Sequence, residues 1–217
     1  MPASTRRLVA GLLAAFCTVT TPVVAAPPQP PAKPYDIVKL ADGVYGFVWK
    51  NPVQDPIESN ALFIINDRDV VVVDAGILPS SARRMAAALR KLTSKPVRYV
   101  VNTHWHDDHH QGNEVYRELW PAVEFIAHRE TRTDIVAKTY APRAQVISDM
   151  KQENQRYARW AASGKDDDGK PIEERRRARM REIAEVYEPA IAEIEKIRNT
   201  PPDLTLVERL VLHRGQR

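Results

Sequence analysis

The sequence predicts an α/β fold, with helices layered on a sheet, from three observations. Four consecutive valines at 70–73 are typical of a strand that is buried on both faces. Apolar residues then recur at helical spacing over 79–92. A second apolar run at 96–101 follows that helix, and strand and helix patterns continue to alternate up to residue 127. This alternation indicates an α/β domain.

The first 26 residues predict a secretory signal peptide. Two arginines near the start precede an apolar run of about 12 residues, Leu8 to Val19, and the small residues Val24-Ala25-Ala26 follow. The run is shorter than the roughly 20 residues of a membrane-spanning helix. We therefore expect cleavage after Ala26, a periplasmic or secreted protein, and no stable membrane insertion after cleavage. The alternative is an uncleaved anchor.

The composition excludes several other classes of protein. Of the 217 residues, 43% are hydrophobic and 28% are charged, which is typical of a globular domain. The net charge of +4 is too small to indicate nucleic-acid binding, for which a concentrated basic face is expected. Because the single cysteine, Cys17, lies in the predicted signal peptide, we expect neither an internal disulfide nor a cysteine-rich zinc module.

The elements follow in order along the remaining chain. Residues 27–36 predict a proline-rich, extended spacer, and residues 37–128 form the predicted α/β unit. The strand at 44–49 alternates weakly and is expected at an edge of the sheet. Other strands are expected at about 60–66, 69–74, 96–101 and 122–127, and helices at about 79–92 and 111–119.

The character of the sequence changes over 129–200, where charges dominate. Two helical stretches are expected, at about 129–162 and 171–198, on either side of the polar loop at 164–169. An apolar stripe in the second stretch predicts that the helices pack as a hairpin. Glutamates flank the arginines at 175–181 on both sides, which favours a solvated helix face over a nucleic-acid or membrane patch.

Metal-binding residue types gather directly after the strand at 96–101. Four of the chain's six histidines lie within seven positions, and His104 and His106 fall on one side of an extended chain. Asp108 and His109 follow on the turn. Imidazole and carboxylate donors bind zinc at about 2.0–2.2 Å, and they also suit iron or manganese. The sequence therefore predicts a site for one or two metal ions, and we consider a metal-free polar loop the weaker interpretation.

The segment His104-Trp105-His106-Asp107-Asp108-His109 resembles the HxHxDH motif of the metallo-β-lactamase superfamily. The valine strand that ends in Asp74-Ala75-Gly76 is similar to the strand that precedes this motif. The resemblance covers about 37–128 and resumes weakly near 203–213. It implies the N-terminal half of an αββα sandwich, with residues 129–200 as a charged helical hairpin insertion.

The resemblance also implies a role for each motif residue. His104 and His106 would bind a first metal ion, and Asp108 and His109 a second. Asp108 would also orient the attacking water or relay its proton, and is therefore the expected catalytic residue. Asp74 would brace the motif loop, residues 102–113, from behind the ligands. The implied reaction is hydrolysis of an amide, ester, lactone or thioester in a small-molecule substrate by a metal-activated water.

The family's further ligands, a third histidine, a bridging aspartate and a last histidine, have no counterpart in the sequence. His128 and His213, the remaining histidines, are expected to be structural or exposed. We therefore expect a C-terminally truncated chain of low or no activity, in which 201–217 begin a missing second half and apolar sheet surface is left uncovered. Two alternatives remain open: a non-enzymatic metal-binding protein, and a helical interaction protein with a vestigial site.

Overall fold

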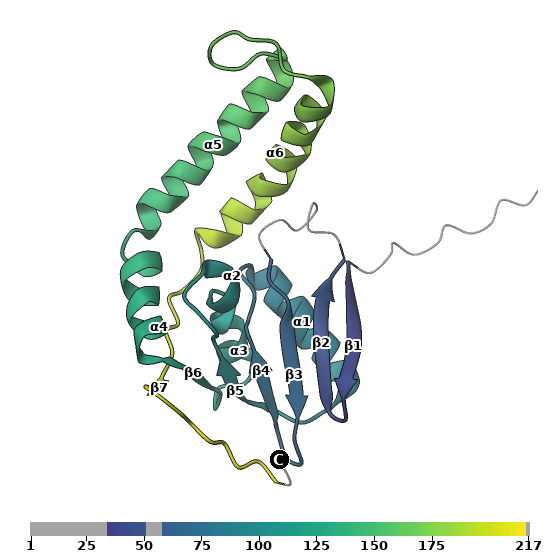
Figure 1. The fold of residues 1–217 in the computed structure, drawn as a ribbon, viewed down its shortest axis with the longest axis vertical. Coiled ribbons are helices and arrows are strands. Elements are labelled where there is room, and N and C mark those ends of the chain that lie inside the picture. Colours follow the sequence, from purple (N-terminus) through teal and green to yellow (C-terminus); the bar gives the residue numbers. More distant parts are fainter. Residues whose placement is uncertain (1–33, 51–57, 216–217) are drawn as a thin grey trace, which may run out of the picture. The chain divides into compact units, whose positions relative to one another are not determined.

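The computed structural model describes residues 34–50 and 58–215. The predicted signal peptide and most of the predicted spacer lie outside these ranges. The described chain forms one seven-stranded sheet in the order β1-β2-β3-β4-β5-β6-β7, with helices packed against it (Figure 1). The mixed α/β fold class predicted from the sequence is thus confirmed.

The elements are bounded as follows. The strands are β1 (Tyr35–Ala41), β2 (Val44–Trp49), β3 (Ala61–Ile65), β4 (Val70–Val73), β5 (Val97–Val101), β6 (Glu124–His128) and β7 (Leu204–Leu206). The helices are α1 (Pro79–Leu92), α2 (Asp107–His110), α3 (Asn113–Leu119), α4 (Arg129–Asp134), the π-helix η1 (Ile135–Tyr140), α5 (Arg143–Ser163) and α6 (Glu174–Ile194).

Strand direction changes at β4. Strands β1 to β4 pair antiparallel, whereas β4 to β7 pair parallel. Parallel strands end at the same edge of a sheet, which is where open α/β sheets carry their ligand sites. Asp74 and Asn102 directly follow β4 and β5, and the Asp74 N–H donates to the carbonyl of Val101 at 2.9 Å. The motif loop therefore starts at this edge.

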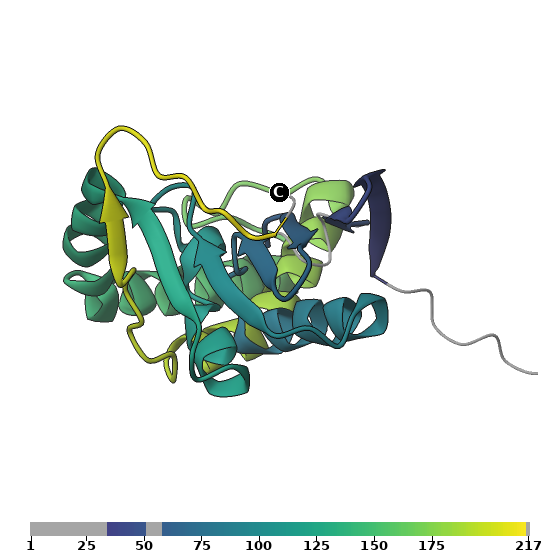
Figure 2. The ribbon, with the colours of Figure 1, turned by 90° about the horizontal axis from the view of Figure 1, so that it is seen from below.

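The hydrophobic core lies between one face of the sheet and the helices α1 and α3. Met85 and Leu89 of α1 and Tyr116 of α3 are buried against the inner side chains of the strands. The opposite face is also apolar, and its residues Val38 and Leu40 are exposed. The chain after β7 runs along this opposite face (Figure 2), where the guanidinium carbon of Arg214 lies 5.5 Å from the centre of the Tyr99 ring.

Helices α5 and α6 form an antiparallel hairpin, because Asn154 of α5 donates to the carbonyl of Ala184 while Arg177 of α6 donates to that of Ala161. The end of α6 returns to the α/β unit. Ile194 packs with Ile197 against Ile77, just after β4. Across the ranges described, no helix is long and apolar enough to span a membrane.

The structure departs from the predicted elements in two N-terminal places. β2 is not an edge strand, because β1 pairs on its outer side and begins at Tyr35, inside the range predicted for the spacer. The single helix predicted at 111–119 is α3 from Asn113 onward, and a separate short helix, α2, precedes it.

Two further departures lie in the C-terminal half. The helix predicted at 129–162 is divided into α4, η1 and α5, and the break falls at Pro142, which has no N–H to continue the helical hydrogen bonds. The strand-like pattern at 204–213 is a strand only over Leu204–Leu206, where it pairs with β6.

Candidate metal centre

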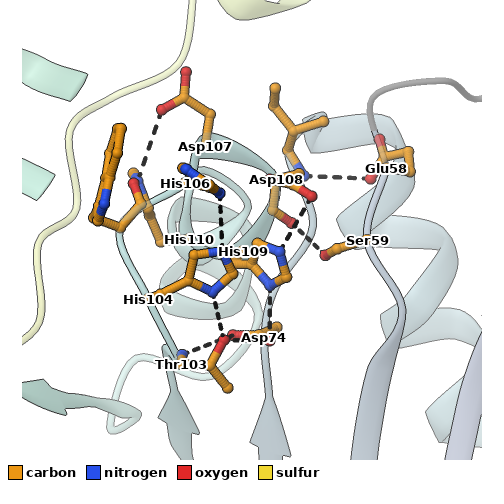
Figure 3. A network of polar contacts seen from close by, with 12 residues as sticks. Glu58, Ser59, Asp74, Thr103, His104, His106, Asp107, Asp108, His109 and His110 are labelled. Carbon is orange, nitrogen blue, oxygen red and sulfur yellow. Dashed lines mark hydrogen bonds and ion pairs between the residues drawn. The ribbon is translucent and has the colours of Figure 1, made fainter. Parts of the chain in front are cut away.

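The site begins with Asp74, whose backbone has a φ of 64°. This left-handed conformation is unusual for a residue other than glycine, although aspartate tolerates it. It turns the buried carboxylate toward the motif loop (Figure 3). There the carboxylate accepts the Thr103 N–H at 2.9 Å, the Thr103 hydroxyl at 2.9 Å and His109 Nδ1 at 2.8 Å. Asp74 thus joins both ends of the motif from behind.

The first pair of donors is His104 and His106. The Thr103 hydroxyl donates to Asp74, so its oxygen accepts from His104 Nδ1, which lies 3.0 Å away. This hydrogen bond leaves His104 Nε2 unprotonated, and Nε2 lies 3.0 Å from Nδ1 of His106 (Figure 3). The two ring nitrogens therefore face each other across a short gap.

The second pair is Asp108 and His109. His109 directs Nδ1 to Asp74, and its Nε2 lies 3.2 Å from Oδ2 of Asp108. Metal-binding histidines commonly give their second ring N–H to a carboxylate, which fixes the ring and leaves the other nitrogen for the metal. His109 has this arrangement, and the rings of His104 and His109 lie only 4.0 Å apart between centres. The two pairs are therefore adjacent.

The donor spacing suits a zinc ion. Two ligands that bind one tetrahedral zinc at about 2.0–2.1 Å are about 3.3 Å apart, and the two pairs have separations of 3.0 and 3.2 Å. Within residues 34–50 and 58–215, no group of three or more His, Cys, Asp or Glu side chains is arranged around one metal position. The structure thus brings the four predicted ligands together as two pairs.

Charge interactions hold the second pair together. Burial disfavours a charged His109, but the hydrogen bonds to Asp108 and Asp74 outweigh this effect and raise the pKa of His109 to about 9. Burial by itself raises the pKa of Asp108, yet the hydrogen bond from His109 and the charge of its ring outweigh this effect and hold the pKa of Asp108 below its usual value. The two side chains therefore form an ion pair at neutral pH. A bound cation would take the place of the proton on His109.

The first pair is electrostatically different. Burial, together with the nearby charges of His109 and His106, lowers the pKa of His104. A neutral imidazole is the form that binds a metal ion. His104 is therefore already in the protonation state of a ligand at neutral pH.

Several residues outside the predicted set of ligands hold the backbone of the motif loop. The Ser59 hydroxyl donates to the carbonyl of Asp108. Asn102 donates to the carbonyl of His109 at 2.9 Å and exchanges amide hydrogen bonds with Asn113. Ser59 lies 49 positions from its partner, so no local pattern marks it. Asn102 and Asn113 lie directly on either side of the predicted ligands in the sequence. This position is the one signal by which they could have been predicted to hold the loop.

Gly112 closes the loop by a direct approach of backbone to backbone. Its N–H donates to the carbonyl of Gly76 at 2.9 Å, and a Cβ at this position would lie 2.1 Å from the carbonyl oxygen of Ala75. Only glycine fits such an approach. The turn after β4 and the start of α3 are thus fixed against each other on either side of the donors.

The structure places the other histidines outside the donor pairs. His110 is fully buried, and burial lowers its pKa to about 4, so it stays neutral while Nε2 contacts the carbonyl of Trp105 at 3.1 Å. His128 accepts the N–H of Glu130 and so caps α4. His213 is exposed beside Asp69, in a small hollow of about 120 Å³.

Comparison with known proteins gives one family. The model of the metallo-beta-lactamase superfamily matches residues 55–198. The hydroxyacylglutathione hydrolase of Gloeobacter violaceus is 35% identical over 86 residues, which are 38% of this chain and 32% of that protein. The chain therefore spans about a third of the length of this curated relative.

Solved structures of metallo-beta-lactamases are also similar. That of Hirschia baltica is 27% identical, with a TM-score of 0.42, over 49% of this chain and 48% of its own. FIM-1 of Pseudomonas aeruginosa, in a mono-zinc form, is 20% identical, with a TM-score of 0.42, over 51% and 49%. That of Erythrobacter litoralis is 23% identical, with a TM-score of 0.40, over 48% and 46%. By its match to the family model over residues 55–198, the chain belongs to the metallo-β-lactamase superfamily.

Proposed function

We propose that this protein is a zinc-dependent hydrolase in which His104 and His106 hold one ion and Asp108 and His109 hold a second. One observation carries the proposal. Each pair presents its two donor atoms to each other at ligand spacing, while the second ring nitrogens of His104 and His109 are held by Thr103 and Asp74. Imidazole and carboxylate donors suit zinc.

The residues divide the work between them. When bound in such a site, zinc lowers the pKa of a coordinated water to near 7 and so supplies a nucleophile at neutral pH. Asp108, which contacts His109 through Oδ2, would orient the attacking water and take up its proton. Asp74 fixes the ring of His109, and through Thr103 that of His104, so that both donor nitrogens stay aimed.

The substrate is a small molecule with a hydrolysable carbonyl. An amide, ester, lactone or thioester meets the chemistry of the site. A relative that is a hydroxyacylglutathione hydrolase supports the thioester among these, because an acyl group on the sulfur of glutathione is a thioester. The site itself selects the reaction rather than the substrate.

Metal content tests the proposal without knowledge of the substrate. The purified chain is compared with the double variant His104→Ala/His106→Ala, with the exposed His213→Ala as the matched control. We expect zinc in the wild-type and control proteins and a loss of at least half of it in the double variant. Equal zinc in all three would contradict the assignment. Turnover of an ester, lactone, thioester or β-lactam that is lost in the double variant would favour the hydrolase over the non-enzymatic alternative.

We further propose that the protein is exported and that the signal peptide is removed after Ala26. The positive start, apolar run and small-residue end of the first 26 residues support this proposal. The intact mass of the protein from the periplasmic fraction tests it. We expect a chain that begins at Pro27. A protein that retains Met1 and stays in the cytoplasm would contradict export.

A further inference from the structure

The π-helix η1 lies directly beside the motif loop. Its wider turn is marked by the Ala141 N–H, which donates to the carbonyl of Val136, five residues back, at 3.0 Å. Single π-turns of this kind occur frequently at functional sites. Tyr140 places its ring 5.7 Å from that of His110, between ring centres, and Lys138 lies 4.9 Å from the centre of the Trp105 ring. The start of the insertion thus contacts the motif through consecutive side chains.

Thr139 makes the polar contact in this set. Its side chain is buried, with 4% of its surface exposed. Its hydroxyl lies 2.8 Å from Oδ1 of Asp107 and 3.3 Å from the carbonyl oxygen of Trp105. Trp105 and Asp107 are the two neighbours of His106 in the chain. One hydroxyl therefore contacts a backbone carbonyl on one side of a predicted metal ligand and a side-chain carboxylate on the other.

This use of the hydroxyl differs from that of a nearby threonine. A threonine within a helix commonly returns its hydroxyl to a carbonyl three or four residues back. Thr133 of α4 does so, donating to the carbonyl of Arg129 at 3.1 Å, and it is exposed. A buried hydroxyl needs a partner, and Thr139 finds its partner on the motif loop rather than on its own helix.

We propose that Thr139 is a positioning residue, which fixes the loop around His106 so that Nδ1 of this histidine faces Nε2 of His104. The first turns of the helical insertion then help to position a ligand of the metal centre. The inference rests on the proposed function because it assumes that His104 and His106 bind a metal ion. The hydrogen bonds between Thr139 and the loop do not depend on that ion.

Hydrogen exchange in the metal-free protein tests the hold on the loop. The N–H groups of His109 and Gln111 donate to the carbonyls of His106 and Asp107, so their exchange reports loop opening. Thr139→Val removes the hydroxyl at nearly constant volume. Loss of one hydrogen bond weakens the local structure, so we expect about fivefold faster exchange at these amides, which corresponds to roughly 1 kcal/mol. Thr139→Ser should exchange like the wild type, and so should Thr133→Val.

Zinc affinity tests the positioning of the ligand. We expect about tenfold weaker zinc binding in Thr139→Val, by competition with a coloured chelator, and a changed visible spectrum of the cobalt-substituted protein. Thr139→Ser should restore both, whereas Thr133→Val should change neither. Asp107→Ala removes the acceptor from the other side. If the two residues act through one contact, the double variant should lose no more zinc affinity than Thr139→Val alone.

The outcomes separate the two proposals. Exchange and zinc affinity that are unchanged in both Thr139→Val and Asp107→Ala would overturn the positioning role. A wild-type protein that binds no zinc would overturn the proposed function, and the exchange measurement would then decide alone whether Thr139 holds the loop. If Thr139→Val folds poorly, Asp107→Ala carries the same test from an accessible position.

Discussion

Around the motif, two backbone segments are in direct contact, whereas in the distal hairpin the two helices are joined by side chains that donate to backbone carbonyls. Gly112 and Gly76 are joined by a direct hydrogen bond beneath the donor pairs. Ala158 and Ala161 of α5 line a hollow of about 270 Å³ beside α6, and the exposed ion pair of Arg179 with Glu182 lies within α6 itself. Exposed ion pairs contribute roughly 0–1 kcal/mol each. The proposed metal centre thus lies where the backbone is held by direct hydrogen bonds.

Gly112→Ala should produce the largest effect. The added Cβ would meet the carbonyl oxygen of Ala75 at 2.1 Å and the Cβ of Ala82 at 2.9 Å, so the turn after β4 must move away from α3. Forced overpacking of this kind costs about 3 kcal/mol. We expect this loss in the free energy of unfolding, measured by urea titration, together with loss of zinc binding.

Gly169→Ala at the hairpin tip is the matched control. Gly169 has a φ of 76°, and an added Cβ would have no neighbouring atom within 4 Å, so the change costs only the left-handed strain of alanine, about 1 kcal/mol. Zinc binding should be unchanged. If the two alanine variants lost equal stability, the contrast between a tightly determined site and a loosely held hairpin tip would be wrong.

Asp74→Asn should have the next largest effect. The amide keeps the tolerance for the left-handed backbone but has only one acceptor oxygen for the hydrogen bonds that Thr103 and His109 give to the carboxylate. A buried donor left unpaired costs about 1–3 kcal/mol. We expect about 2 kcal/mol lower stability and 10–100-fold weaker zinc binding, the typical loss when a group that orients a metal ligand is changed.

Asp167→Asn makes the same chemical change in the loop between the hairpin helices. Asp167 accepts the indole N–H of Trp160 at 2.8 Å in an exposed setting, and an amide oxygen can accept that bond too. The change should stay within about 0.5 kcal/mol. Zinc binding by Asp74→Asn as tight as that by Asp167→Asn would show that Asp74 does not orient the ligands.

The two regions also differ in how much their sequence predicts. The valines of β4 and the helical spacing of α1 are local signals, and both elements lie where the sequence analysis expects them. The four candidate ligands are adjacent in sequence, so the sequence alone is enough to name them. Ser59 and Thr139 also donate hydrogen bonds to the motif loop, and they lie 49 and 32 positions from their partners.

Contacts over such distances leave no periodic pattern. The π-turn of η1 is equally hidden, because no residue pattern marks a hydrogen bond to the fifth residue back and only Pro142 signals a break. The start of the edge strand β1 was not predicted for a different, local reason. Its prolines lie just before Tyr35, and they masked where the extended spacer becomes a paired strand.

Shortening the hairpin should have the smallest effect on the metal centre. The contacts that join the hairpin to the α/β unit come from its proximal end: Glu193 accepts the N–H of Ser80 at 2.9 Å, and Ile194 packs with Ile197 against Ile77. A variant in which a short Gly-Ser linker replaces residues 155–183 keeps these contacts, and it keeps Asn154 beside Ala184. Helical content, measured by circular dichroism, should fall, while zinc affinity should stay within about twofold because no group that holds the motif loop is removed.

The informative comparison is between this shortened chain and Thr139→Val. If zinc binding depends on the insertion only through its first turns, removal of the distal hairpin must cost less affinity than removal of one hydroxyl at Thr139. The opposite result would be a tenfold loss of zinc affinity in the shortened chain and no loss in Thr139→Val. It would indicate that the motif is held by the packing of Ile194 and Ile197 on Ile77. Ile197→Ala, which opens that cluster but leaves η1 in place, would then reproduce the loss.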